Sequence, residues 1–214
     1  MITKEKLVQY LKNSEAKNLQ GLAKLKTIYR PYICPFDEIL NLMPDNVKLF
    51  DIGCGSGSFL SIINNFKNSD TLAGIEISEK LVQEARTILS SKIKNLTIFK
   101  YDGKNIPDEI HNYEYISMID VFHHIPKNIQ KEFLIQLYSK MSSGSYLLFK
   151  DIDASSLFVY FNKLHDLVLS NEIGNEISTN NAIKILNNIG FEMIYCSEKL
   201  MLLYPHYTIL VRKP

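Results

Sequence analysis

Residues 47–57 read VKLFDIGCGSG, an apolar run that leads into three glycines at alternate positions, Gly53, Gly55 and Gly57. Residues 47–51 predict a strand. The glycines allow the backbone to turn tightly, and they let a ligand approach where a Cβ would block it. In open α/β sheets, ligands bind beyond the carboxyl ends of the strands, near the point where the strand order reverses. The stretch therefore predicts a ligand site directly after this strand.

Two common nucleotide-binding fingerprints do not match the loop. A nicotinamide fingerprint needs the spacing G-x-G-x-x-G, but its third glycine falls on Ser58 or Leu60, depending on the starting glycine. A P-loop fails as well, because no Gly-Lys-Ser/Thr follows. An acid does lie where a ribose-binding carboxylate is expected. Glu76 follows Gly57 by 19 residues and lies in the predicted strand 72–77.

Strands and helices alternate along the first 150 residues. Apolar runs of strand length are separated by stretches whose apolar residues recur at helical spacing. This alternation is typical of an α/β fold with a doubly wound, mostly parallel sheet. The predicted strands are residues 47–51, 72–77, 96–101, 115–119 and 146–149, and the predicted helices are residues 59–66, 81–89 and 126–141.

The two flanks of this core differ from it. The polar opening segment carries leucines at helical spacing and ends at Pro31 and Pro35, since proline disfavours helix in the residue before it. A short helix is expected over 36–43. The last third predicts a helix over 157–169 and a second helix, capped by Thr179, that runs to 189.

The C-terminal segment predicts a hairpin. Residues 191–200 and 206–211 have strand character, and Pro205 lies between them as the expected turn. A hairpin pairs its strands antiparallel, so one edge of the otherwise parallel sheet is expected to be antiparallel.

Composition excludes several classes of protein. The chain has 214 residues, with 24 Lys and Arg against 23 Asp and Glu, which gives a net charge of +1. Nonspecific nucleic-acid binding is mainly electrostatic, so this balance argues against a nucleic-acid partner. No apolar run approaches the roughly 20 residues of a membrane span, and no secretory signal is visible. Cys34, Cys54 and Cys196 suit neither a disulfide framework nor a zinc site, which favours a cytoplasmic protein.

Four motifs in this order resemble those of the class I S-adenosylmethionine-dependent methyltransferases. They are the acid and glycines of 51–57, Glu76, the segment Tyr101-Asp102-Gly103, and residues 120–126, DVFHHIP. The resemblance covers residues 35–150 well and extends loosely to the C-terminal hairpin, the family's strands six and seven. It implies a Rossmann-like, seven-stranded sheet, with S-adenosyl-L-methionine as cofactor and S-adenosyl-L-homocysteine as product.

The resemblance also implies a domain plan and a cofactor site. We expect one domain, 1–214, made of a helical lead-in or lid (1–45), a cofactor-binding core (46–150) and an acceptor side (151–214), as a monomer or homodimer. In the family, the counterpart of Glu76 binds the ribose, and the counterpart of Asp102 takes the adenine amino group. The expected cofactor residues are Asp51, Gly53, Cys54, Gly55, Gly57, Glu76, Ile77, Asp102, Gly103, Asp120 and Val121.

Methyl transfer from a sulfonium mainly requires alignment of the reactants, and a base helps when the acceptor must lose a proton. The candidate bases are His165, on the helix expected over 157–169, His206 in the hairpin, and His124 after the fourth strand. For the pair His123-His124, a structural or cofactor-pocket role stays open. His111 is expected on the surface.

Further residues are candidates for contact with the acceptor. Arg30 suits a carboxylate, either that of the cofactor's methionyl group or that of an anionic acceptor. Charges at the mouth of a buried strand, as at Lys150, Asp151 and Asp153, are costly unless they pair or meet a ligand, and a solvated strand end is the alternative. The candidate acceptor-binding residues are Tyr29, Arg30, His123, Lys150, Asp151, Asp153 and Tyr204.

The predicted function is methyl transfer to a small molecule. Near-neutral charge and the lack of an Asn/Asp-Pro-Pro-Tyr tetrad after the fourth strand argue against nucleic-acid acceptors. No metal site is predicted. O-methylation of a metabolite, or of an envelope or secondary-metabolite intermediate, is the first hypothesis. N- or C-methylation of a small molecule and a catalytically silent cofactor-binding module are the alternatives.

Overall fold

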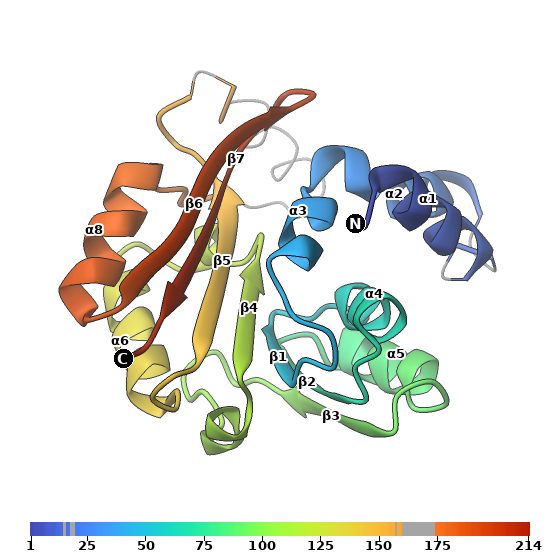
Figure 1. Ribbon diagram of the computed structural model, residues 1–214, viewed down its shortest axis with the longest axis horizontal. Coiled ribbons are helices and arrows are strands. Elements are labelled where there is room, and N and C mark those ends of the chain that lie inside the picture. Colours follow the sequence, from blue (N-terminus) through green and yellow to red (C-terminus); the bar gives the residue numbers. More distant parts are fainter. Residues whose placement is uncertain (15, 18–19, 157, 160–173) are drawn as a thin grey trace.

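A seven-stranded sheet forms the centre of the molecule (Figure 1). The computed structural model describes residues 1–14, 16–17, 20–156, 158–159 and 174–214. The strand order is β3-β2-β1-β4-β5-β7-β6. The strands are β1 (Leu49–Ile52), β2 (Thr71–Glu76), β3 (Asn95–Lys100), β4 (Tyr115–Ile119), β5 (Tyr146–Ile152), β6 (Glu192–Met201) and β7 (Tyr204–Arg212).

The direction of the strands confirms the expected Rossmann-like topology. Strands β1 to β5 pair parallel to one another, whereas β7 pairs antiparallel with both β5 and β6. The strand order reverses at β1, which lies between β2 and β4. The carboxyl ends of these three strands therefore meet at the switch point, where ligands of such sheets bind.

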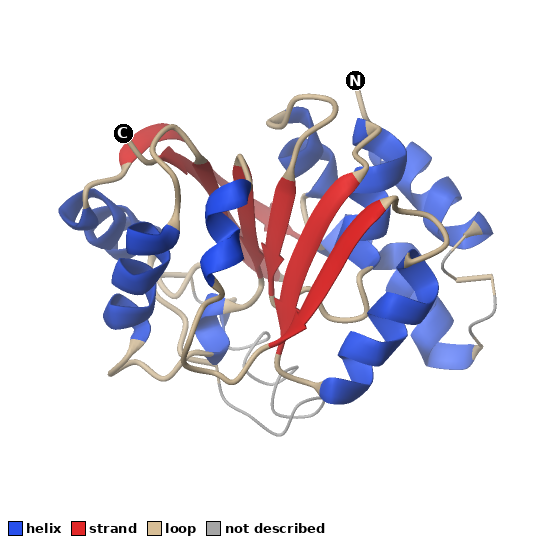
Figure 2. Ribbon diagram, turned by 90° about the horizontal axis from the view of Figure 1, so that it is seen from below, coloured by secondary structure: helices blue, strands red, loops and turns tan. Residues whose placement is uncertain are grey.

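Helices cover both faces of the sheet (Figures 1 and 2). The helices are α1 (Lys4–Asn13), α2 (Gly21–Ile33), α3 (Phe36–Asn41), α4 (Ser58–Lys67), α5 (Glu79–Leu89), α6 (Gln130–Lys140) and α8 (Thr179–Ile189), with short 3-10 turns η1 (Asp108–Asn112) and η2 (Phe122–His124). None of the described helices is long and apolar enough to cross a membrane.

Alternation along the strands divides the apolar core into two layers. In β5, Leu148 packs into the layer beneath α1, α3, α4 and α5, whereas Leu147 and Phe149 pack into the layer beneath α6 and α8. Successive side chains of a strand point to opposite faces, so one strand serves both layers. The buried, apolar β1, β4 and β5 are typical of parallel strands that are covered on both sides.

Two predicted boundaries are wrong in the lead-in and before α8. Helix α2 continues through Pro31 to Ile33, because a proline in the last turn disturbs few helical hydrogen bonds. The cap of α8 is Ser178, whose side chain accepts the Asn181 N–H, and not Thr179. The N–H of Thr179 donates instead to the carboxylate of Asp153 at 3.2 Å, which holds it inside the helix.

The predicted turn at Pro205 is also wrong. Pro205 is the second residue of β7 and pairs with Leu200. The turn therefore comes before β7, at Leu202-Leu203. Leu202 supplies the left-handed backbone that the turn needs, with a φ of 55°. A proline near the start of a strand removes only one ladder hydrogen bond, which makes this position tolerable. The helix predicted over 126–141 begins later, at Gln130, and the helix predicted over 157–169 lies almost wholly outside the described residues.

Candidate cofactor and acceptor site

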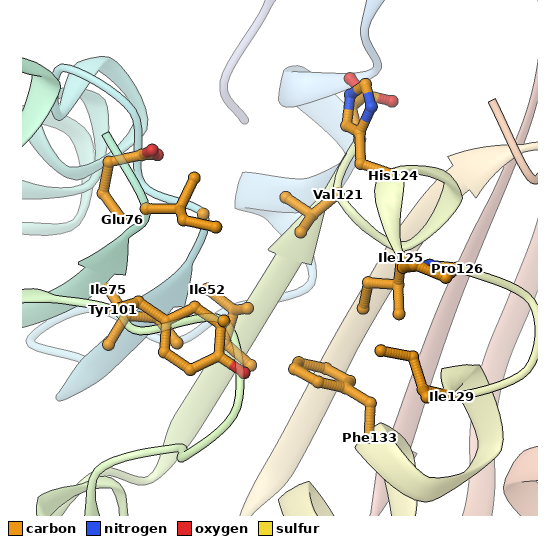
Figure 3. Close-up of a pocket in the computed structure, with 14 residues that line it drawn as sticks. Ile52, Ile75, Glu76, Tyr101, Val121, His124, Ile125, Pro126, Ile129 and Phe133 are labelled. Carbon is orange, nitrogen blue, oxygen red and sulfur yellow. The ribbon is translucent and has the colours of Figure 1, made fainter. Parts of the chain in front are cut away.

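A cavity of about 470 Å³ opens at the carboxyl ends of β1, β2 and β4 (Figure 3). Figure 3 shows Glu76 and Tyr101 on one side of it and His124, Ile129 and Phe133 on the other. Its position is the switch point that the glycine loop predicted. The predicted residues that line it are Gly53, Glu76, Ile77, Gly103, Asp120, Val121 and His124.

Glu76 is held in a fixed orientation at the end of β2. One carboxylate oxygen accepts the N–H of Gly55 at 3.0 Å, and the other accepts the N–H of Ser78 at 2.8 Å. A carboxylate has about four acceptor positions, so each oxygen can still accept a hydroxyl from a ligand. The predicted contact with a ribose diol fits this geometry.

Two glycines of the loop are needed for different reasons. A Cβ on Gly53 would lie 2.5 Å from the side chain of Val121, so only glycine allows the β1 loop to pass that close to the β4 loop. A Cβ on Gly55 would meet no atom within 4 Å, although its φ of 56° favours glycine. The open space beside Gly55 is available to a ligand.

Three predicted cofactor residues of the loop make contacts in the protein interior, and their contact with the cofactor stays a prediction. A Cβ on Gly57 would collide with Leu89, so this glycine lets α4 pack against α5. Cys54 is buried against Gly74 of β2. Asp51 is buried and accepts the Ser117 hydroxyl at 2.6 Å. Burial raises the pKa of Asp51 to about 7, and burial likewise raises that of the Cys54 thiol.

The segment after β3 meets the cavity through residues other than the predicted acid. Tyr101 and Gly103 line the cavity. The exposed carboxylate of Asp102 accepts the N–H groups of Lys104 and Asn105, both at 2.7 Å. These bonds lower the pKa of Asp102 to about 2. The predicted bond from Asp102 to an adenine amino group stays a prediction, since the carboxylate now caps its own turn.

Sequence reasoning missed the apolar wall of the cavity. Ile129 and Phe133 face it from the start of α6, at i, i+4 spacing. That spacing indicates an apolar helix face but not what the face covers. The other missed lining residues are Ile52, Ile75, Tyr101, Ile125 and Pro126.

Asp120 joins the cavity to a buried group of charges. It follows β4 with a φ of 55°, an uncommon backbone conformation that Asp tolerates better than most residues. Its carboxylate forms an ion pair with Lys150, whose side chain is fully buried, and lies 3.9 Å from the Arg30 guanidinium. Burial raises the pKa of Asp120, but the charges of Lys150 and Arg30, joined at acid pH by that of protonated His206, outweigh burial and lower it well below its usual value.

His206 lies beside this ion pair on the same face of the sheet. It pairs with Ile152 of β5, two residues beyond Lys150. Its ring is buried and makes no hydrogen bond of standard geometry with the described residues. It stacks on the Tyr204 ring, with 6.2 Å between the ring centres. Burial and the neighbouring Lys150 lower the pKa of His206 to about 4, so the imidazole is neutral at pH 7.

The predicted acceptor residues Asp151 and His123 form a second pair, on the opposite face. The Nδ1–H of His123 donates to the Asp151 carboxylate, which also accepts the His123 backbone N–H at 3.1 Å. The His123 ring lies 4.1 Å from that of His124, which is exposed on the cavity wall. The buried pair therefore positions the segment that carries His124.

The remaining predictions are distributed around the site. Asp153 is buried and accepts the N–H groups of Ser155 and Thr179, which gives it a structural task at the start of α8. Tyr29 is exposed on α2, and contact of Tyr29, Lys150, Asp151 or Asp153 with an acceptor stays a prediction. His165 lies outside the described residues. Among the described residues, no group of His, Cys, Asp and Glu is arranged to hold a metal ion.

A family model described as a methyltransferase domain matches residues 24–195, which is most of the chain. The chain belongs to this methyltransferase family. It is a class I S-adenosylmethionine-dependent methyltransferase, as the four motifs predicted, and S-adenosylmethionine is its cofactor.

Relatives of this methyltransferase have different names. Over 177 residues, it is 29% identical to a tRNA (guanine-N(7)-)-methyltransferase of Prochlorococcus marinus. The matched region covers 68% of this chain and 82% of that protein. It is 25% identical over 133 residues to a carboxy-S-adenosyl-L-methionine synthase of Campylobacter fetus, covering 56% of this chain and 53% of that protein. The magnesium protoporphyrin IX methyltransferase of Synechocystis, solved with bound SAH, aligns with a TM-score of 0.70 at 16% identity, over 99% of this chain and 100% of that one. Because these names differ, they do not identify the acceptor of this chain.

Proposed function

We propose that this methyltransferase transfers the methyl group to an oxygen atom of a small molecule, a metabolite or an envelope or secondary-metabolite intermediate. The observation that carries the proposal is the polar group where β4 and β5 end. Asp120 and His124 lie on the cavity wall, and the neutral His206 is buried beside Asp120 and Lys150. A hydroxyl acceptor must release a proton as it reacts, and an imidazole is the side chain best suited to take it.

The chain's own residues would bind and orient the two reactants. When bound, S-adenosylmethionine supplies a methyl group that its positively charged sulfur already activates. Glu76 would accept the ribose hydroxyls, and Ile129 and Phe133 would enclose the adenine ring. The carboxylate of Asp120, held on the wall by Lys150, would favour the positive charge of the donor.

His124 is the base that the geometry favours. Its ring is exposed on the cavity wall, where an acceptor bound in the cavity would lie beside it. His206 is only 3% exposed, which suits a neutral group that supports Asp120 better than a group in contact with an acceptor. His165 stays a third candidate.

The exchange His124→Gln tests this role. It is expected to lower kcat by about 100-fold or more while the affinity for S-adenosylhomocysteine stays within about twofold, because general-base catalysis contributes about 10²–10⁴-fold. His111→Gln is the matched control, since His111 is exposed on η1. Full turnover by His124→Gln, His206→Gln and His165→Gln alike would show that none of these three histidines acts as the base.

A second candidate function is N7-methylation of guanine in tRNA. The 29% identity to the Prochlorococcus marinus protein favours it. The net charge of +1 argues against it, because binding to a polyanion depends on a surplus of basic side chains.

Labelled donor distinguishes the two candidates. The enzyme is incubated with methyl-labelled S-adenosylmethionine and, separately, with total tRNA and with a protein-free extract of small metabolites. We expect label in the small-molecule fraction, on oxygen when the product is analysed by NMR. Label on nitrogen or carbon would support the corresponding alternative, and label in tRNA alone would overturn the proposal. Cofactor binding with no label in either pool would indicate a silent binding module.

A further inference from the structure

Two cations, Arg30 and Lys150, share the carboxylate of Asp120. Asp37 is a second carboxylate within range of this group, and the imidazole of His206 is neutral at pH 7. Asp51, the next carboxyl coupled to Arg30, is buried and has a pKa raised to about 7, so it is only partly ionised. The donor sulfur of the cofactor adds a further positive charge when it is bound. Arg30 therefore shares one carboxylate with a buried lysine, and a cation that is only partly compensated in a partly desolvated place favours the binding of an anion.

Arg30 is the member of this group that a ligand can reach. The side chain of Lys150 is fully buried, whereas that of Arg30 is 45% exposed. The guanidinium lies 5.5 Å from the centre of the Phe36 ring, which limits its motion from one side. Within the described part of the chain, its ion pair with Asp120 at 3.9 Å is too long for a hydrogen bond. Its N–H donors therefore remain available to a planar acceptor.

We propose that Arg30 is a specificity-determining residue that binds a carboxylate of the methyl acceptor. This inference rests on the proposed function, since it assigns a substrate class to the same site. A guanidinium holds a carboxylate through two parallel hydrogen bonds, which fixes the orientation of the bound molecule as well as its position. A carboxylate anchored on Arg30, beside Asp120, would place the rest of the acceptor over the cavity mouth, where His124 lies.

The methionyl carboxylate of the cofactor is the competing partner for Arg30. The two partners differ in what a variant loses. If Arg30 binds the acceptor, removal of its charge leaves cofactor affinity unchanged. If Arg30 binds the methionyl group, the variant binds S-adenosylhomocysteine about 10-fold or more weakly, as expected when a charge-assisted hydrogen-bonded pair is lost.

The experiment compares Arg30→Gln with Arg212→Gln. Arg212 is a matched control because its side chain is 44% exposed and lies 4.0 Å from Glu192. It pairs with Tyr146 at the start of β5, at the opposite end of this strand from Lys150. S-adenosylhomocysteine affinity is measured by calorimetry for both variants and the natural chain. Acetate and acetamide, a small anion and its neutral counterpart, are then titrated into the saturated protein, and the arginine Nε–H signals are followed by NMR.

The two possible partners of Arg30 predict different results. S-adenosylhomocysteine affinity should stay within about twofold in both variants. Acetate should shift the Arg30 Nε–H signal saturably, acetamide should not, and the Arg212 signal should not move. Equal shifts at both arginines, or none at Arg30, would overturn the proposal, as would weak cofactor binding by Arg30→Gln. No turnover is needed, so this result is independent of the labelling experiment that tests the proposed function.

Discussion

Lys150 carries its charge where there is no solvent. Its side chain is fully buried, and its ammonium group rests against the carboxylate of Asp120. Transfer of such an ion from water costs several kcal/mol unless a partner compensates. The pair holds the Asp120 carboxylate on the cavity wall, so its value for the enzyme is the position of that carboxylate.

Loss of one member of this pair should be costlier than loss of both. Lys150→Met is expected to lower the free energy of unfolding by about 3 kcal/mol, because Asp120 keeps a charge without its counter-ion. The double variant Lys150→Met/Asp120→Asn should recover at least half of that loss. Urea unfolding at pH 7 measures both, and a single variant as stable as the natural chain would contradict the account.

His206 makes stability depend on pH in the acid range. Its pKa is about 4 in the fold, against 6.5 without the fold's influence, so between these values only the unfolded chain binds the proton. Stability from the neutral imidazole is complete above pH 6.5 and falls as the pH drops towards 4, by about 3 kcal/mol in total.

The variant His206→Phe isolates this effect. Asp51, whose pKa is raised from 3.8 to about 7, titrates with the opposite sign over an overlapping range. The difference in unfolding free energy between natural chain and variant removes the contribution of Asp51. That difference should change between pH 6.5 and 4, and a constant difference would show that His206 is not held neutral.

The glycine loop between β1 and α4 combines two requirements that look alike in the sequence. Gly57 begins α4 with a φ of 84° and leaves room for Leu89 of α5. Gly55 has a φ of 56° and faces open space. The first glycine therefore serves helix packing, whereas ligand approach at the second stays a prediction.

Alanine substitution should separate these roles. Gly57→Ala is expected to destabilise the fold by about 2–4 kcal/mol, from backbone strain and from overpacking against Leu89. Gly55→Ala should lower the free energy of unfolding by only about 1 kcal/mol. It should nevertheless weaken the binding of S-adenosylhomocysteine by at least about 10-fold. Thermal unfolding and calorimetry on both variants check this, and a reversed pattern would exchange the two assignments.

In the whole molecule, the cavity at the switch point is lined by loops that are far apart in sequence. Gly53 follows β1, Glu76 ends β2 and Asp120 follows β4. A ligand that binds only the folded chain stabilises all of these elements together. The division into a lead-in, a core and an acceptor side stays a prediction, as does the oligomeric state.

S-adenosylhomocysteine at 100 times its dissociation constant is expected to raise the free energy of unfolding by about 3 kcal/mol. Glu76→Gln should abolish most of this gain at the same concentration, because a neutral amide accepts the ribose hydroxyls more weakly than a carboxylate. Glu79→Gln, on the exposed side of α5, is the control. An undiminished gain in Glu76→Gln would remove Glu76 from the ribose site.

Local sequence patterns account for most of the features that were predicted correctly. The strands, the antiparallel hairpin and the positions of Gly53, Glu76 and Asp120 follow from periodicity and from motifs at strand ends, and the fold confirms that the three lie together. The errors at Pro205 and Thr179 share one cause. Each boundary depends on a hydrogen-bonding or pairing partner that local propensity does not reveal, Leu200 across the hairpin for Pro205 and Asp153, 26 residues earlier, for Thr179.

The sequence by itself determined the family, the cofactor and the sheet, because a glycine loop and acids at strand ends are encoded within short stretches. Only the tertiary structure decided which charges are buried together. Lys150 and His206 share a face with Asp120, whereas Asp151 pairs with His123 on the other. That division depends on strand register and on burial, and both arise only when segments distant in the chain pack against one another.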